Sequence, residues 1–542
     1  MTLFWTYLCK TRDMSELDAL QTMSSHKQTS RTAKSLQNVK VAFAFYLINL
    51  ILQFFSRKIF LDYLGSEVLG LNTTAQNLLG FLNLAELGIG SAVAYNLYKP
   101  LFDNNRQAIN DIVSIQGWLY RRIAYIVIAG SVILMCFFPW IFAKAQVPLW
   151  YTYGSFITLL VSALLGYFVN YRQIVLSADQ KEYKITFSVQ GVKIIKVLLQ
   201  MLAIWQLSNG YVYWMTLEVI MAVVTSLVLD KTIHKEYPWL NPQISQGSAL
   251  QQQYPEIIRK TKQVFFHKIG SFVLTQTSPL IIYAYASLTL VAIYGNYILI
   301  VTGVTTLMGA LLNGVNAGIG NLVAEGNKQH IKNVYWEITL LRIWIASIIC
   351  FGMFMLGDSF ITLWVGKEYI LPHTAFVILI INTFITLTRT NDSFIAAYGI
   401  YQDIWAPVAE AMLNLGCSIL LGHFFGLVGI LGGVLISLLL IVCSWKPYFL
   451  YRYGFREPIV EYVRRYVKYI VIIVLLFIAC SEISNYCFIT PVNSYVQWIA
   501  YGVKVLALYV ILSAMVFAST DKTARNLLGR IYKFIHKIRN ND

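Results

Sequence analysis

The chain has 542 residues, of which 57% are hydrophobic and 13% are charged, with a formal net charge of +16. Soluble domains carry about 25% charged residues, so a soluble protein of this length would lack the charge to cover its surface. The mean hydropathy of +0.60 and repeated apolar runs near the ~20 residues that cross a bilayer indicate an integral membrane protein.

The excess of basic residues does not indicate a nucleic-acid partner, because no arginine-rich tract alternates with aromatic residues and no nucleic-acid module is recognisable. The seven cysteines form no CxxC pair and no Cys/His ligand spacing. Cys480 and Cys487 fall on one predicted helix with roughly 10 Å of rise between them, which is too far for a disulfide. We therefore expect no metal, no other cofactor and no disulfide framework.

Fourteen hydrophobic runs predict an all-α integral membrane protein of about fourteen transmembrane helices. Residues 1–37 before them are expected to be a cytoplasmic N-terminal tail, in which Met14 or Met23 is an alternative start to Met1. The predicted spans are residues 41–62, 70–97, 118–142, 151–176, 185–207, 211–230, 264–286, 290–322, 338–357, 372–398, 404–423, 426–445, 466–487 and 495–517.

Lysine and arginine positions predict the topology of these spans. They cluster in the N-terminal tail, in the even-numbered connections and after residue 520, whereas the odd-numbered connections hold little beyond Lys144 and Lys367. Basic loops remain on the cytoplasmic side. Both termini are therefore expected in the cytoplasm, which requires an even number of spans.

The chain also contains an internal repeat. NLAELGIG in the second span (residues 83–90) matches NGVNAGIG in the eighth (residues 313–320), at an offset of 230 (320 − 90). Polar residues then recur along a stripe about 80° wide on each helix: Asn72, Gln76, Asn83 and Glu86 in the first half, and Thr302, Thr306, Asn313 and Asn316 in the second. These residues either help the helices pack or line a central cavity, and we favour the cavity.

A weaker similarity continues the repeat. DNNRQAIN (103–110) resembles EGNKQHIK (325–332) at an offset of 222 (325 − 103), and LSADQKEYKI (176–185) occupies the same place as IAAYGIYQDI (395–404). Two pseudo-symmetric six-helix bundles are predicted, with a substrate site where the repeats face each other. The predicted parts are the tail 1–37, an N-terminal bundle 38–235, a cytoplasmic linker 236–262, a C-terminal bundle 263–448, two additional transmembrane helices 449–518 and a basic cytoplasmic tail 519–542.

Charged residues at mid-membrane are the candidate functional groups, because each costs on the order of 3 kcal/mol to insert. The span 185–207 holds Gln190, Lys193, Lys196 and Gln200 within about 120° of one another. Snorkelling explains lysines near helix ends but is a poor explanation for two lysines at mid-depth. We interpret this face as the lining of a polar cavity.

Three further cations have two readings each. Arg389, on one face with Asn382 and Ser393, either forks onto a phosphate or pairs with a neighbouring acid. Lys268 shares a stripe with serine and threonine residues but lies shallow enough to be an interfacial lysine. Arg57 lies near the outer end of the first span, where snorkelling is the alternative to a cavity role.

Two acids are candidates for balancing these cations or for carrying a proton. They are Glu86 and Glu410, and a structural salt bridge is the alternative for each. Glu218 is interpreted as isolated and less informative. No nucleotide-binding loop, GxSxG or HExxH motif occurs, and the odd-numbered loops are too short for a membrane-bound polymerase or ligase of sugar chains. We therefore do not expect an enzyme.

Several segments resemble a known family. DYLGSEVLGLNTTAQNLLGFLNLAELGIGSAVAYNLYKPL (62–101), YRQIVLSADQKEY (171–183) and RTNDSFIAAYGIYQDIWAPVAEAMLNLGCSILLGHFFGLVGILGGVLIS (389–437) are similar to the polysaccharide-transporter flippases of O-antigen and capsule synthesis. This family belongs to the multidrug/oligosaccharidyl-lipid/polysaccharide exporter superfamily. The chain departs from it after Asp403, where Ile404 and Trp405 stand and an arginine is expected, which puts a substrate role for that loop in doubt.

The resemblance implies two bundles around a central cleft that opens alternately to each side of the bacterial inner membrane. The implied cargo is an oligosaccharide on a polyprenyl diphosphate, flipped from the cytoplasmic to the periplasmic leaflet, with membrane lipids and the polysaccharide polymerase machinery as partners. The alternative from the same superfamily is an ion-coupled multidrug exporter. Its cavity is expected to favour acids and aromatics for organic cations, whereas mid-membrane lysines favour an anion.

Overall fold

The computed structural model describes residues 25–527, apart from residues 87, 401, 404 and 489–492, together with residue 529. For residues 25–36, 85, 263–264, 266–276, 310–317 and 321 it describes the backbone but not the side chains. All regular structure in the described residues is helical. They form two compact units that divide between Ala292 and Ile293.

The N-terminal unit contains eleven described helices or parts of helices and three short 3₁₀ segments. They are α2 (Ser25–Leu82), η1 (Asn83–Glu86), α3 (Ile89–Phe102), α4 (Arg106–Cys136), α5 (Phe138–Ile141), α6 (Leu149–Phe168), η2 (Asn170–Gln173), α7 (Ile174–Ala178), α8 (Glu182–Gln206), α9 (Gly210–Glu236), η3 (Ile244–Gln246), α10 (Gly247–Leu250), α11 (Pro255–Tyr285) and the first turn of α12 (Leu288–Glu325).

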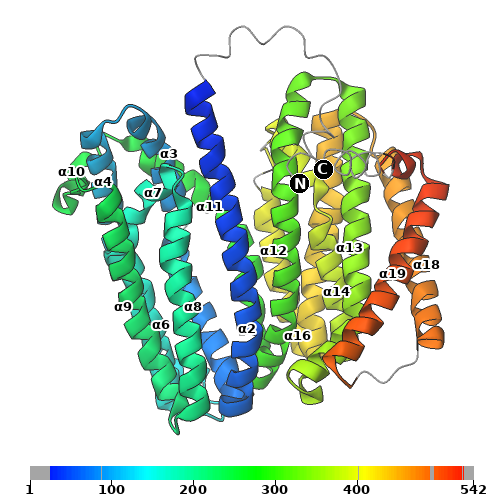
Figure 1. The fold of residues 1–542 in the computed structure, drawn as a ribbon, viewed down its shortest axis with the longest axis horizontal. Helices are drawn as coiled ribbons and strands as arrows, with labels where there is room; N and C mark the ends of the chain where they lie inside the picture. Colours follow the sequence, from blue (N-terminus) through cyan, green and yellow to red (C-terminus); the bar gives the residue numbers. More distant parts are fainter. Residues whose placement is uncertain are drawn as a thin grey trace. The chain divides into compact units, whose positions relative to one another are not determined.

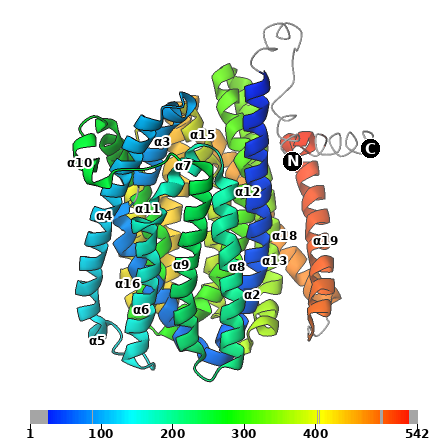
Figure 2. The ribbon, with the colours of Figure 1, turned by 60° about the vertical axis from the view of Figure 1, so that its left-hand side comes forward.

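Within this unit the long helices pack side by side (Figures 1 and 2). Both α6 and α8 pack against α2 and α9, α4 packs against α3 and α6, and α11 lies along α2 and α3. The contacts therefore group α11 with the helices that precede it. The predicted division into a bundle ending at residue 235 and another beginning at residue 263 remains a prediction.

The C-terminal unit contains the remainder of α12 and the helices that follow it. They are α13 (Lys328–Trp364), η4 (Lys367–Tyr369), α14 (His373–Leu387), α15 (Thr390–Tyr398), α16 (Trp405–Ser437), the π-helical η5 (Leu438–Trp445), α17 (Lys446–Phe449), the π-helical η6 (Leu450–Phe455), α18 (Val460–Cys487) and α19 (Tyr495–Thr520).

In the C-terminal unit, α13 packs against α14, α18 and α19, and α14 packs against α16. Buried aromatic rings join α13, α15, η6 and α18; they include Tyr335, Trp336, Phe394 and Tyr462. Large rings bury 150–250 Å² each, so this cluster fixes one end of the unit. The additional helices predicted after residue 449 correspond to α18 and α19.

Eleven helical stretches in the described residues are long and apolar enough to cross a membrane. Two of them, Gln37–Leu82 and Trp405–Phe455, have 46 and 51 residues, about twice what one crossing needs. Each contains a glycine with non-helical geometry, Gly65 (φ 81°) and Gly426 (φ 56°), which divides it into two spans. Every one of the fourteen predicted runs overlaps a helix, which confirms the all-helical membrane fold.

The hairpin at Gly426 depends on small residues. A Cβ atom on Gly429 would overlap the Leu421 carbonyl oxygen, and one on Gly433 would overlap the backbone nitrogen of Ser418. The two arms of α16 therefore touch through their backbones, as glycines allow in membrane helices.

The internal repeat recurs in local backbone geometry. Asn105 and Asn327, at an offset of 222 (327 − 105), each cap a helix by accepting a hydrogen bond from the backbone N–H three residues later, at 3.1 Å in both cases. The residues before them, Asn104 and Gly326, both have positive φ, 52° and 76°. The offset equals the one predicted for this segment.

A second pair of equivalent turns ends α7 and α15. Gln180 and Gly399, at an offset of 219 (399 − 180), have φ of 58° and 67°, and each N–H donates to the carbonyl three residues earlier at 3.1 Å. A left-handed residue after a helix is a common helix C-terminus, and here both units use it at matching positions.

Four predicted spans are not continuous helices. The third breaks at Phe137, between α4 and α5. The second is interrupted by η1 and by Gly88 (φ 98°), the fourth by η2, and the tenth at Thr388 and Arg389. The expectation that Asn72 to Glu86 form one helical stripe is therefore wrong. The expectation that Asn382 to Ser393 share one helical face is wrong for the same reason.

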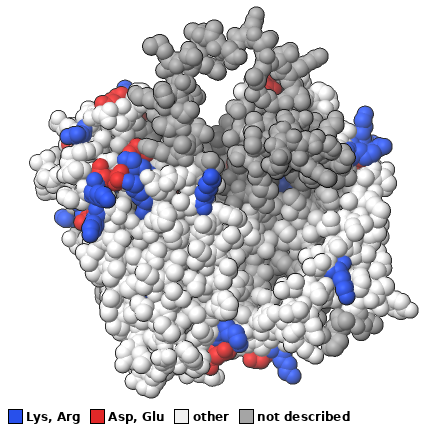
Figure 3. Space-filling model, viewed as in Figure 1, with Lys and Arg blue, Asp and Glu red and all other residues white. Residues whose placement is uncertain are grey.

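Charged side chains lie mainly near the helix ends. On the face shown in Figure 3, most of them gather toward the upper and lower ends of the helices, and the band between holds few charges. Such a band matches the hydrocarbon layer of a bilayer. The chain is a multi-pass integral membrane protein.

Candidate functional site

The polar face predicted for the fifth span lies on α8. Lys196 Nζ lies 2.6 Å from Oε1 of Glu218 on α9, and Gln200 Nε2 donates to the other oxygen of that carboxylate at 3.0 Å. The side chains of Lys196 and Glu218 are 21% and 12% exposed, so the ion pair is largely buried between the two helices. The interpretation of Glu218 as isolated is wrong, because Glu218 neutralises Lys196 and holds Gln200.

Lys193, one turn earlier, differs from Lys196. It is half-buried, and no hydrogen bond or ion pair joins it to any residue in the described part of the chain. Its neighbour Gln190 faces α2, where Asn49 Nδ2 donates to Gln190 Oε1 at 3.2 Å. Lys193 thus keeps its ammonium hydrogens for water or a ligand.

The 3₁₀ turn η1 brings two predicted site residues together. Tyr120 on α4 donates to Glu86 Oε1 at 2.9 Å, and Tyr167 on α6 donates to Asn83 Oδ1 at 2.9 Å. The two tyrosine rings meet edge to face with centroids 5.6 Å apart. In the described residues no cation pairs with Glu86. Its carboxylate and the Asn83 carbonyl each accept a hydrogen bond from a tyrosine hydroxyl.

The earlier part of the same predicted stripe behaves differently. Asn72 Oδ1 is buried and accepts hydrogen bonds from Ser155 at 2.6 Å and Tyr211 at 2.8 Å. These bonds join α2 to α6 and α9. Asn72 therefore helps the helices pack and does not line a cavity. Gln76, by contrast, is exposed.

Arg389 stands at the break between α14 and α15. Its two terminal nitrogens each lie 3.1 Å from an oxygen of Glu410 on α16, and its Nε lies 2.8 Å from Asp392. The sequence left open whether Arg389 binds a phosphate or pairs with an acid, and in the structure it pairs with acids. Glu410 is 2% exposed, so this bidentate pair is buried and charge-assisted.

Further charges extend this network. Lys446 Nζ lies 2.8 Å from Asp403 and 3.9 Å from Asp392. Arg342 on α13 donates to the Arg389 carbonyl at 3.1 Å and to Ser393 at 3.2 Å. The acid Asp403, whose loop was in doubt as a substrate site, therefore has a structural partner.

The network balances three cations, Arg342, Arg389 and Lys446, against three acids, Asp392, Asp403 and Glu410. The cavity beside it is only about 10 Å³, about the space of one water molecule. Arg389 and Glu410 therefore hold the ends of α14, α15 and α16 together, and neither is open to a bulky ligand in this arrangement.

The remaining predicted site residues fall into two groups. Arg57 donates to the Ala292 carbonyl at 3.0 Å, so it joins α2 to the first turn of α12. The side chains of Lys268, Asn313 and Asn316 lie outside the described part of the chain, and their cavity role remains a prediction.

Two clusters at helix ends were not recognised from the sequence. Lys181 lies 2.8 Å from Asp179 and 3.1 Å from Glu236, which also pairs with Lys184. In the C-terminal unit, Lys332 lies 2.5 Å from both Glu457 and Glu461. Each cluster joins two even-numbered connections, which agrees with the predicted alternation of the loops. Only the basic partners had been used to predict topology.

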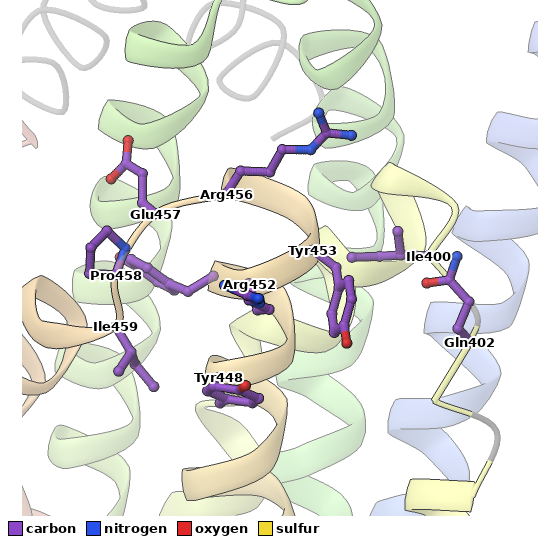
Figure 4. Close-up of a pocket in the computed structure, with 10 residues that line it drawn as sticks. Ile400, Gln402, Tyr448, Arg452, Tyr453, Arg456, Glu457, Pro458 and Ile459 are labelled. Carbon is purple, nitrogen blue, oxygen red and sulfur yellow. The ribbon is translucent and has the colours of Figure 1, made fainter.

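Two hollows lie in the C-terminal unit. A polar one of about 760 Å³ is lined by η6 and the turn after it (Figure 4). An apolar groove of about 550 Å³ runs between α13, α14, η5 and α18, with Cys350, Phe384, Leu439 and Phe477 among its walls. Both volumes are in the range of ligand sites.

No protein-family sequence profile and no curated protein sequence matches the chain, but solved structures do. An inward-facing multidrug resistance MATE family transporter of the MOP superfamily aligns with 82% of this chain and 97% of its own, with a TM-score of 0.58 and 13% identity. The lipid II flippase MurJ, in an inward closed conformation, aligns with 88% of this chain and 99% of its own, with a TM-score of 0.59 and 13% identity. The chain has a MATE-type fold. At this identity the similarity concerns the fold and not the cargo.

Within the MATE-type fold the interrupted fourth and tenth spans are counterparts. The break after α6 at Asn170 and the break after α14 at Arg389 stand at an offset of 219 (389 − 170), the same as for the turns that follow them. Each break carries an arginine that pairs with an acid on another helix: Arg172 with Asp230 and Arg389 with Glu410. The repeat therefore preserves the backbone break, whereas the two ion pairs use non-equivalent positions, because at this offset Arg389 falls on Asn170 and Glu410 on Gly191.

Proposed function

We propose that the chain is a flippase that moves a polyprenyl-diphosphate-linked oligosaccharide from the cytoplasmic to the periplasmic leaflet of the bacterial inner membrane. The cargo would serve O-antigen or capsule assembly, and transport would proceed by alternating access. The observation that carries the proposal is Lys193, a half-buried cation within a predicted span, which makes no hydrogen bond or ion pair with the described part of the chain. The MATE-type fold supports it, since a lipid II flippase shares that fold.

The chemistry of the headgroup explains why such a cation is needed. A sugar diphosphate cannot enter hydrocarbon, because each unsatisfied polar group costs several kcal/mol there. Lys193 offers the phosphates a charge, while the half-buried amide of Gln190, one turn away on α8, offers hydrogen bonds to hydroxyls. Lys196 lies too close to Glu218 to contribute a full charge.

The apolar groove of the C-terminal unit suits the other half of the cargo. Most of its walls are isoleucine, phenylalanine, valine and leucine side chains from α13, α14, η5 and α18, and its volume is about 550 Å³. A prenyl chain that moved from the lipid into this groove would exchange one set of apolar contacts for another, at little cost in free energy. We propose this groove as a site for a prenyl chain held by the C-terminal unit.

An ion-coupled multidrug exporter is the second candidate, and Glu86 is the observation that favours it. A carboxylate held by a phenol and without a cation in the described residues could exchange a proton or receive an organic cation. Within the flippase, the same group would serve as the coupling acid.

The two candidates are separated by a transport assay in vesicles. The purified chain is reconstituted with a fluorescent polyprenyl-diphosphate oligosaccharide, and the labelled headgroup is quenched from outside over time. We expect flipping well above protein-free vesicles and no uptake of a cationic dye by the same preparation. Dye uptake without flipping would overturn the flippase in favour of the exporter.

Glu86→Gln is expected to abolish any stimulation of flipping by an imposed proton gradient. Glutamine still accepts the hydrogen bond from Tyr120 but cannot take up a proton, so folding should be preserved. Glu482→Gln, an exposed acid on α18, is the matched control and should respond like the unmodified chain. An unchanged gradient response in Glu86→Gln would remove this residue from coupling.

A further inference from the structure

The polar hollow at the end of η6 is built by three segments of the C-terminal unit. Tyr448, Tyr451, Arg452 and Tyr453 come from α17 and η6, residues 456–459 from the following turn, and Ile400 and Gln402 from the segment after α15. Figure 4 shows the Arg452 guanidinium in the middle of this group, with the Tyr448 ring below it in the view. The hollow combines a cation, exposed aromatic rings and an apolar rim.

The charges around the hollow leave it electropositive. Arg452 and Arg456 are exposed and have no hydrogen bond or ion pair in the described part of the chain. Glu457, the acid that lines the hollow, pairs elsewhere, since it and Glu461 both lie 2.5 Å from Lys332. In Figure 4, Glu457 points away from Arg452.

The backbone here departs from ordinary helix. Residues 450–455 are π-helical, and Arg456 after them has φ 57° and ψ 45°, a left-handed conformation that is uncommon for a residue other than glycine. π-Helical turns occur frequently at functional sites, and strained residues cluster at ligand sites. Arg452 and Tyr453, on this π-helical turn, are exposed at the helix end.

The hollow and the apolar groove lie along the same helices. The groove includes Cys443 on η5 and Tyr466 on α18. Tyr448 of the hollow lies five residues after Cys443, and Ile459 of the hollow lies seven residues before Tyr466. Seven helical residues rise roughly 10 Å. A lipid whose headgroup lay in the hollow could extend its chain into the groove.

We propose that this hollow binds the phosphate of a lipid headgroup at the predicted cytoplasmic surface. Arg452 is the main cation, since a guanidinium forks onto phosphate oxygens, and Arg456 is the second. Tyr448 and Tyr453, 44% and 51% exposed, offer ring faces to an attached sugar. For a diphosphate-linked oligosaccharide the hollow is the loading site, an assignment that rests on the proposed function.

The test measures binding in nanodiscs of phosphatidylcholine, with geranylgeranyl diphosphate as the probe and the full chain as the protein. Arg452→Gln is expected to weaken binding at least about tenfold, which corresponds to about 1.4 kcal/mol, because the phosphate loses its hydrogen bonds to a charged group. Arg452→Lys should recover part of it. Arg464→Gln removes an exposed charge near the start of α18, outside the hollow, and should leave binding unchanged.

The outcomes are distinct. Equal losses in Arg452→Gln and Arg464→Gln, or no loss in Arg452→Gln with Arg456→Gln combined, would overturn the site. Phosphatidylglycerol in the nanodisc distinguishes the source of the phosphate: competition with the probe assigns the site to bulk anionic lipid, and its absence to prenyl diphosphates. A chain that binds the probe through Arg452 yet flips no oligosaccharide would refute the proposed function and leave the site standing.

Discussion

Replacing Lys193 with glutamine is expected to slow flipping at least about tenfold, because the diphosphate loses a charge-assisted contact worth about 1.5–3 kcal/mol. The thermal midpoint of unfolding should change little, since Lys193 has no hydrogen bond or ion pair in the described chain to lose. Lys193→Arg keeps the charge and should retain most of the activity. Vesicle flipping and thermal unfolding in detergent are the two measurements.

Lys196 is the matched control on the same helix, and it should behave in the opposite way. Lys196→Gln leaves the Glu218 carboxylate, 12% exposed, without its cation, and breaking a buried pair costs on the order of 3 kcal/mol. The double variant Lys196→Gln with Glu218→Gln should recover stability. A Lys193→Gln chain that is folded and flips normally would take Lys193 out of the cargo path.

The fold was predictable because its determinants are local in sequence. Apolar runs predicted spans that overlap the helices throughout, and the matching segments around Asn105 and Asn327 have the same helix caps. A cap needs only one side chain and the next backbone turn. Similar sequence at these positions therefore predicts similar geometry.

The site was less predictable because its determinants are tertiary. Lys196 and Glu218 lie on different helices, and only the packing of α8 on α9 brings them together. Likewise, a 100° periodicity assumed for the second and tenth spans could not reveal the interruptions at Asn83 and Arg389. Breaks inside membrane spans are tolerated where other groups satisfy the freed backbone. Here the Arg389 carbonyl, for example, accepts from Arg342.

Arg389→Gln is expected to destabilise the chain by about 3–5 kcal/mol, the cost of removing one partner from a buried ion pair. Glu410, 2% exposed, would lose both of its hydrogen bonds from the guanidinium. Glu410→Gln should cost less, because Arg389 still keeps Asp392 at 2.8 Å. Thermal unfolding can be followed with a thiol-reactive dye, since Cys350 is buried in the same unit.

Two control variants decide whether the Arg389–Glu410 pair stabilises the fold or binds the cargo. Lys58→Gln breaks an ion pair whose side chains are 42% and 43% exposed, and should cost at most about 1 kcal/mol. The double variant Arg389→Gln with Glu410→Gln should regain part of the lost stability, because no buried carboxylate is then left without a cation at this position. If Arg389→Gln unfolded like the unmodified chain but failed to flip, the guanidinium would have to leave Glu410 during transport and bind the phosphate itself. The bidentate pair would then be a resting contact that the cargo displaces.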